Sequence, residues 1–226
     1  MAARRPGLAS GMLGLLLAGS LALAGCGQAM AAENHVRAPI AQTKAKESGL
    51  KTAIFAGGCF WGVEAVFSHV KGVTAAVSGY HGGTERQASY KLVSSGITDH
   101  AEAVKVTYDP RVIRYDQLLR IYFSVVADPT QLNRQGNDVG TQYRSAIFPL
   151  DGQEDEARAA IVRWNDEHPG QQAVTTIESG EWYPGEDYHQ EYWEGEGQRN
   201  PYCQAVIPPK LMKLRRSFQK YLKADA

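Results

Sequence analysis

The residue of this 226-residue chain whose position points most directly to chemistry is Cys59. An apolar run over residues 53–56 ends at Gly57 and Gly58, which is typical of a buried strand followed by a turn. The apolar residues that come next recur at helical spacing as far as Gly72, where a helix would end. Cys59 is therefore expected at a helix N-terminus, where backbone N–H groups and the helix dipole lower a thiol pKa and favour the reactive thiolate. The alternative is an unreactive cysteine buried at a strand end.

Phe60 and Trp61 follow directly and place two large, exposed apolar side chains beside the sulfur, which favours a reactive thiol over a core cysteine. The other cysteines are Cys26 and Cys203. If Cys26 is lipidated, Cys59 and Cys203 remain as a pair, which either forms a structural disulfide or cycles between thiols and disulfide. The six histidines are scattered, and no cysteine or histidine spacing matches a metal site, so no metal is expected.

The start of the chain has the features of an export signal. Two arginines precede an uncharged run, apolar from Gly11 onward, that is too short to span a membrane. Small residues stand directly before Cys26, as in the lipobox of bacterial lipoproteins, which predicts a signal peptide over residues 1–25 and lipidation of Cys26. The alternative is an ordinary signal peptide cut near Ala32. Either way we expect an exported protein of the bacterial cell envelope, in the periplasm or held at a membrane by its lipid alone.

Residues 26–50 are rich in Ala, Gln and Lys and predict a flexible tether, while residues 51–226 suit one globular domain. Without residues 1–25 the chain has 22 basic residues against 24 acidic ones. No basic run or basic-aromatic stripe stands out, so nucleic acid is not an expected partner. The domain is expected to act as a monomer.

Helices and strands are expected to interleave along this domain. Residues 101–108 alternate as a half-buried strand does, and residues 115–127 have the apolar spacing of an amphipathic helix. Further strands are expected over residues 73–78, 143–148 and 174–177, and further helices over residues 88–93, 153–168 and 208–222. The irregular unit length predicts an α+β fold, a compact two-layer α/β sandwich of the ferredoxin-like type with long loops.

Two polar connections could supply further functional groups. Residues 128–144 carry many hydrogen-bonding side chains, and residues 181–193 combine several aromatic residues with His189. Irregular segments of this length are uncommon unless they are functional. The alternative for each aromatic residue is ordinary packing.

The motif Gly-Cys-Phe-Trp-Gly at residues 58–62 resembles the signature of the A-type peptide methionine sulfoxide reductases. Six further blocks continue the resemblance in order, at residues 79–83, 89–90, 100–102, 133–145, 187–190 and 200–203. The resemblance runs from about residue 50 to the end of the chain. It implies reduction of methionine (S)-sulfoxide, free or in oxidised proteins, without a cofactor.

The resemblance also implies a role for each matching position. Cys59 would attack the sulfoxide sulfur, Glu102 would protonate the sulfoxide oxygen, and Cys203 would resolve a Cys59 sulfenic acid into a Cys59–Cys203 disulfide. A thioredoxin-like dithiol would then reduce this disulfide. The substrate would contact Phe60 and Trp61 with its methyl group, Tyr90 and Tyr143 with its oxygen, and a network of Asp138, His189 and, more weakly, Tyr192.

The chemistry places demands on two of these residues. The sulfoxide oxygen would leave as a strong base, so a neighbouring acid has to stay protonated near neutral pH. Burial beside aromatic residues would raise the pKa of Glu102 in this way, although strand alternation also allows a solvent-facing Glu102. Cys203 follows a Gly-rich segment over residues 195–201 that is expected to swing toward Cys59.

Two departures from the family pattern are visible. Gln87 and Ala88 stand where many members have Asn-Pro, and no further cysteine follows Cys203, which predicts a single relay step. Two other functions compete with reduction. A cysteine hydrolase or acyltransferase would activate Cys59 through His100 or His189 with Asp138 as the acid, and a non-enzymatic lipoprotein would bind a ligand through its aromatic loops. Cys203 favours the reductase, because a hydrolase has no use for a second thiol.

Overall fold

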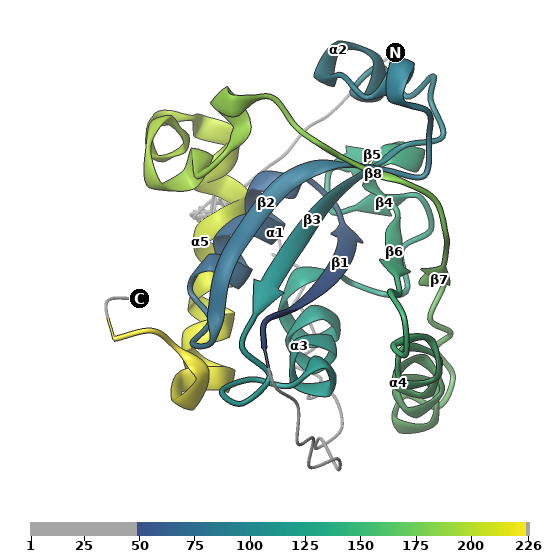
Figure 1. Cartoon of the computed structure of the whole chain (residues 1–226), viewed down its shortest axis with the longest axis vertical. Coiled ribbons are helices and arrows are strands. Elements are labelled where there is room, and N and C mark those ends of the chain that lie inside the picture. The colour runs from purple at the N-terminus through teal and green to yellow at the C-terminus, as the bar shows by residue number, and fades with distance from the viewer. Residues whose placement is uncertain (1–48, 225–226) are drawn as a thin grey trace, which may run out of the picture. The chain divides into compact units, whose positions relative to one another are not determined.

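The computed structural model describes residues 49–224 (Figure 1). The predicted signal peptide, Cys26 and nearly all of the predicted tether lie outside these residues. Within the described part of the chain, no helix is both long enough and apolar enough to cross a membrane.

The centre of the fold is a β-α-β-β-α-β unit. Its elements are β1 (Lys51–Gly57), α1 (Phe60–Ser68), β2 (Val73–His81), β3 (Ala101–Tyr108), α3 (Tyr115–Ile121) and β6 (Ser145–Phe148). The four strands pair antiparallel in the order β6-β1-β3-β2, which is the arrangement of the ferredoxin-like plait. This confirms the predicted α+β sandwich, and the strand expected over residues 101–108 is correct at both ends.

Shorter elements extend this unit. The sheet gains β7 (Thr176–Ile177), parallel to β6, and β8 (Trp182–Pro184), antiparallel to β2. The remaining named elements are α2 (Tyr90–Val93), β4 (Arg134–Gln135), β5 (Asp138–Val139), α4 (Glu154–Glu167) and α5 (Pro201–Phe218). The polar connection over residues 128–144 is therefore a compact structure, built from the β4–β5 hairpin and a short 3-10 turn at Thr141–Tyr143.

The main core lies on one side of the sheet. Helix α1 packs on β2 and β3 and against α5, and Figure 1 shows α1 behind these strands. Phe55 of β1 stacks on Phe67 of α1 and on Tyr122, with ring centroids 5.2 and 5.3 Å apart. Burial of such rings supplies most of the favourable free energy of folding and fixes α1 on the sheet.

Helix α5 differs from its predicted extent. It begins at Pro201 and not at residue 208, and Pro208 and Pro209 lie inside it. Its start is set by Asn200, whose side chain accepts the Tyr202 backbone N–H at 2.9 Å, with Pro201 at the first helical position. The prediction used the proline pair as a helix start and missed this earlier cap.

Candidate active site

Cys59 lies where β1 gives way to α1, as predicted. It is the residue that caps α1, and its carbonyl oxygen accepts the Gly62 N–H at 3.1 Å. The preceding Gly58 has a φ of 90°, and a Cβ there would come within 2.8 Å of the Gln135 side chain. Only glycine fits this turn, which carries the chain from the strand to the helix.

The Cys59 thiol does not have the predicted low pKa. Burial raises its pKa well above the usual value, a nearby Glu102 acts in the same direction, and the Trp61 backbone N–H and the Tyr202 hydroxyl lower it by less. Desolvation therefore outweighs the helix N-terminus, because the charged thiolate loses more hydration than these donors replace. Cys59 holds its proton at neutral pH in this structure.

Glu102 is a buried neighbour of this thiol. Its side chain is 2 % exposed, which excludes the solvent-facing alternative, and its Oε2 accepts the Phe60 backbone N–H at 3.0 Å. Burial raises the pKa of Glu102 to about 8, the Phe60 N–H opposes this shift, and Asp138 adds to it. The carboxyl group is therefore mostly protonated at neutral pH, at the N-terminus of the helix that Cys59 caps.

Trp61 provides an aromatic wall beside Cys59. Its Nε1–H donates to Nδ1 of His189 at 3.2 Å, and its ring stacks on Tyr192 with centroids 4.0 Å apart. Burial lowers the pKa of His189, so its ring is neutral and can accept this bond. Phe60 is fully buried, and its ring lies beside that of Trp61. The sequence suggested instead that both rings are exposed.

Two tyrosines complete the surroundings of Glu102. Tyr90 begins α2 and Tyr143 ends the short 3-10 turn, and both lie close enough to Glu102 and Cys59 to be influenced by their charges. Burial is the main cause that raises the pKa of Tyr90 to about 12 and the pKa of Tyr143 further. Both hydroxyls therefore remain hydrogen-bond donors at neutral pH.

Cys203 is placed differently from the prediction. It is a free thiol in the first turn of α5, fully buried in the core cluster against which Cys59 also packs. Burial raises its pKa to about 11. Cys203 belongs to a helix, so a swing of residues 195–201 toward Cys59 would have to carry the first turn of α5 with it.

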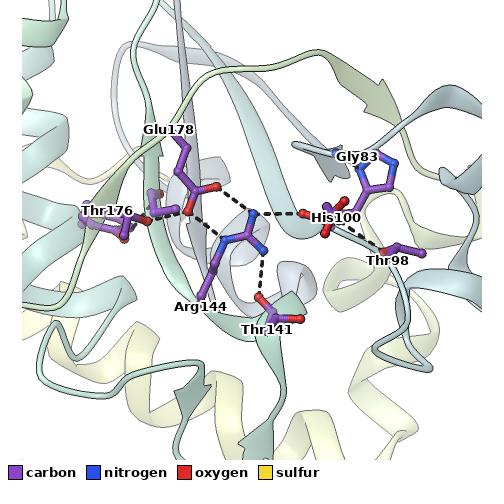
Figure 2. Close-up of polar contacts among 10 residues, drawn as sticks. Gly83, Thr98, His100, Thr141, Arg144, Thr176 and Glu178 are labelled. Carbon is purple, nitrogen blue, oxygen red and sulfur yellow. Dashed lines mark hydrogen bonds and ion pairs between the residues drawn. The ribbon is translucent and has the colours of Figure 1, made fainter.

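The alternative base His100 is occupied elsewhere. Figure 2 shows it beside Gly83, whose backbone N–H donates to His100 Nδ1 at 3.1 Å, while His100 Nε2 lies 2.9 Å from the Thr84 carbonyl oxygen. Both ring nitrogens thus hold the loop after β2, and the structure does not bring His100 to Cys59 as a base. His189 accepts a bond from Trp61 and supports the aromatic wall in the same way.

Arg144 anchors the segment that carries Tyr143. Its guanidinium makes a bidentate ion pair with Glu178, at 2.9 and 2.7 Å, and also donates to the Thr141 and Asp99 carbonyl oxygens (Figure 2). These bonds join the 3-10 turn before Tyr143 to the segment that enters β3, where Glu102 lies. Arg144 therefore helps to fix the relative position of Tyr143 and Glu102.

Sequence reasoning missed two residues that the structure brings to this site. Tyr202 donates its hydroxyl hydrogen to Asp138 at 2.5 Å and lies close enough to Cys59 to lower the pKa of its thiol. Glu186 accepts the Tyr80 hydroxyl at 2.6 Å and the Tyr90 backbone N–H at 2.9 Å. Tyr202 could have been noticed because it directly precedes Cys203, whereas nothing in the sequence around Glu186 pointed to a bond with a tyrosine 106 positions earlier.

No group of three or more potential metal ligands is present among residues 49–224. A cavity of about 320 Å³ lies beside the later part of α1, lined by residues that include Glu64, His69 and Trp193, and none of the predicted site residues borders it. The predicted site is a partly open cluster around Cys59 and not this cavity.

Comparison with known proteins agrees with this arrangement. The family model of the peptide methionine sulfoxide reductases matches residues 51–222. The chain is 56% identical over 171 residues to peptide methionine sulfoxide reductase MsrA of Erwinia tasmaniensis, covering 75% of this chain and 95% of that protein. It is 50% identical over 180 residues to the MsrA of Clavibacter michiganensis subsp. michiganensis, covering 77% of this chain and 99% of that protein.

Solved structures give the same result. Methionine sulfoxide reductase A of Corynebacterium diphtheriae superimposes with a TM-score of 0.59 at 32% identity, covering 69% of this chain and 77% of that chain. Mxr1 from Saccharomyces cerevisiae in reduced form also gives 0.59, at 34% identity, covering 67% and 86% of the two chains. With a family match over most of its length and a cysteine at the expected helix N-terminus, this chain belongs to the peptide methionine sulfoxide reductase family.

Proposed function

We propose that this family member reduces methionine (S)-sulfoxide, free or in proteins, with Cys59 as nucleophile and Glu102 as acid. The observation that carries the proposal is the buried Glu102 carboxyl group, held by the Phe60 N–H at the N-terminus of the helix that Cys59 caps. With a pKa raised to about 8 by burial, Glu102 keeps a proton to deliver near neutral pH.

The two protonated groups supply what oxygen transfer needs. Cys59 sulfur attacks the sulfoxide sulfur while Glu102 protonates the oxygen, and the Cys59 proton passes to the Glu102 carboxylate. This attack forms a bond between the two sulfur atoms. The protonated oxygen then moves to the Cys59 sulfur, which breaks that S–S bond and the methionine S–O bond and forms the S–O bond of Cys59. Methionine sulfur is reduced by two electrons, Cys59 is oxidised to a sulfenic acid, and Glu102 ends with its proton restored.

The surrounding side chains suit a sulfoxide ligand. Trp61, stacked on Tyr192, offers an apolar face for the methyl group, with Phe60 and His189 behind it. Tyr90 and Tyr143 supply neutral hydroxyl donors for the sulfoxide oxygen, and Asp138 accepts hydrogen bonds at the edge of the site. The preference for the S epimer is proposed from the resemblance of the sequence motifs to the A-type reductases.

The oxidation then passes from Cys59 to Cys203. The Cys203 thiol attacks the sulfenic acid, the S–S bond forms, the S–O bond breaks, and water leaves. An external dithiol of the thioredoxin type reduces the resulting disulfide by exchange. In this proposal the relay consists of one step, from Cys59 to Cys203.

A direct assay tests the activity. The purified domain is given each epimer of methionine sulfoxide with dithiothreitol, and methionine is measured; we expect product from the S epimer and little from the R epimer. Cys203→Ser should form about one equivalent of methionine and then stop with a thioredoxin-type reductant, because its sulfenic acid has no partner. Absence of product from both epimers, together with hydrolysis of a thioester, would favour the cysteine hydrolase instead.

We also propose that the protein is exported and anchored by a lipid on Cys26, with residues 26–50 as a tether to the domain over residues 51–226. Support comes from the sequence alone: two arginines, an apolar run and small residues before Cys26. Cys26→Ser should move the protein from the membrane fraction to the soluble fraction of the envelope. Unchanged membrane association of that variant would rule out this anchor.

A further inference from the structure

The first turn of α5 connects Cys59 to the residue directly before Cys203. The Tyr202 hydroxyl donates to Asp138 at 2.5 Å and lies close enough to the Cys59 sulfur for each group to shift the pKa of the other. Cys203 is fully buried and lies in the core cluster. Successive side chains on an α-helix point about 100° apart, and in this structure Tyr202 is the one directed to Asp138 and Cys59, while Cys203 is directed into the core.

We infer that Tyr202 occupies the place that Cys203 must take, and that disulfide formation requires the first turn of α5 to rotate by about one residue, roughly 100°, which exchanges the Tyr202 hydroxyl for the Cys203 thiol at Cys59. This inference rests on the proposed relay from Cys59 to Cys203 and names the conformational change that would control it. Tyr202 positions Cys59 and Asp138 for oxygen transfer, and its departure begins the second step.

The proline pair inside α5 makes such a rotation local. Pro208 and Pro209 have no N–H, so they cannot bond to the carbonyl groups of Gln204 and Ala205 four residues earlier. The turn with Cys203 is thus joined to the rest of the helix by fewer hydrogen bonds than an uninterrupted helix would have. Beyond the prolines, the buried side chains of Leu211, Leu214 and Phe218 hold the second half of α5 in the core.

The start of α5 is also connected to the aromatic wall of Trp61 and Tyr192. Asn200, which caps the helix, donates through Nδ2 to the Tyr192 hydroxyl at 3.2 Å, and Tyr192 stacks on Trp61. Rotation of this turn therefore removes Tyr202 from Asp138 and strains the contact that supports the aromatic wall. Substrate binding and disulfide formation become alternative states of one helix turn.

The resolving step itself is balanced. Cys203 sulfur attacks the sulfenic sulfur of Cys59, the S–S bond forms and the S–O bond of Cys59 breaks. The hydroxide that leaves takes the Cys203 thiol proton, so the only by-product is water.

A single-turnover experiment on the full-length protein tests this inference. Methionine formed and disulfide formed are measured separately by rapid quenching and mass analysis after mixing with excess substrate. Pro208→Ala/Pro209→Ala restores two helical N–H donors and should slow disulfide formation about tenfold while methionine formation keeps its rate. Tyr202→Phe should slow methionine formation and speed the conversion of sulfenic acid to disulfide, because the turn is released.

Ser217→Ala is the matched control, since it favours the same helix at an exposed position far along from the prolines and should leave both rates unchanged. The inference is overturned if the double proline variant resolves at the unmodified rate, or if Tyr202→Phe does not speed resolution. The Cys203→Ser variant distinguishes failure of the Cys59–Cys203 relay from failure of the proposed rotation of the helix turn. Full turnover of Cys203→Ser with a dithiol protein would defeat the relay, whereas blocked turnover with unaffected proline variants would defeat only the rotation.

Discussion

The Glu102 carboxyl group accepts the backbone N–H of Phe60 at 3.0 Å, which places an acid with a pKa of about 8 beside the cysteine that caps the same helix. The helix N-terminus favours the ionised carboxylate and burial favours the neutral acid. Burial is the larger effect, so the Glu102 carboxyl group is mostly protonated at pH values near neutrality.

This balance predicts the pH dependence of catalysis. The proposed mechanism uses the acid form of Glu102, so kcat/KM for methionine sulfoxide should fall as the pH rises through about 8. Glu102→Ala should lose about 10²- to 10⁴-fold in activity, while Glu102→Gln should lose less, since an amide still donates a hydrogen bond to the oxygen. Steady-state rates from pH 6 to 10 check this. An alkaline fall that persists in Glu102→Gln would assign it to another group.

The bond from Trp61 to His189 gives a second prediction. Trp61→Phe keeps an aromatic face but leaves a buried His189 nitrogen without its donor, so KM for methionine sulfoxide should rise roughly tenfold. Trp193→Phe is the control. Trp193 is half-buried and close to His189 in the sequence, but it borders the cavity beside α1 and not the site around Cys59. Equal KM values for both variants would show that the Trp61 bond does not matter for substrate binding.

Glu186 should position Tyr90 without touching the reacting atoms. Its two carboxylate oxygens accept the Tyr80 hydroxyl and the Tyr90 N–H, and an amide can replace only one of these acceptors. Glu186→Gln should therefore lower kcat/KM about tenfold, with a far-UV circular dichroism spectrum like that of the unmodified protein. The exposed Glu196→Gln should have no effect. An equal loss in both variants would indicate a general effect of charge.

Arg144 and Arg158 allow a comparison of buried and exposed ion pairs. Arg144→Ala removes four hydrogen bonds from a guanidinium whose side chain is 14% exposed, and should lower the free energy of unfolding by about 2–3 kcal/mol. Arg158→Ala removes an exposed pair with Glu154 on α4 and should cost less than about 0.5 kcal/mol. Urea denaturation measures both values, and equal values would show that the Arg144 network adds no stability.

Local patterns in the sequence predicted much of this fold. The alternation of residues 101–108 marked β3 to the residue, and glycines after an apolar run placed Cys59 at the start of a helix. Both features depend on the periodicity and backbone freedom of neighbouring residues. The start of α5 was missed because a proline pair suggested a helix start, while the real signal was the single cap at Asn200.

The electrostatics of the site could not be predicted in the same way. The pKa of Cys59 depends on burial by segments far along the chain, and this burial reverses the effect of the helix N-terminus. Strand alternation also left open which side Glu102 faces. The bond between Tyr202 and Asp138 joins residues 64 positions apart, and only the folded chain brings them together.

The raised pKa of Cys59 has a consequence for survival during oxidative stress. Peroxides oxidise thiolates much faster than protonated thiols, and over-oxidation to sulfinic acid is irreversible for most proteins. A repair enzyme must work where the oxidant that damages its clients is also present. Because the half-exposed Cys59 thiol stays protonated, it is a poor target for peroxides, and its electrons remain available for damaged methionine.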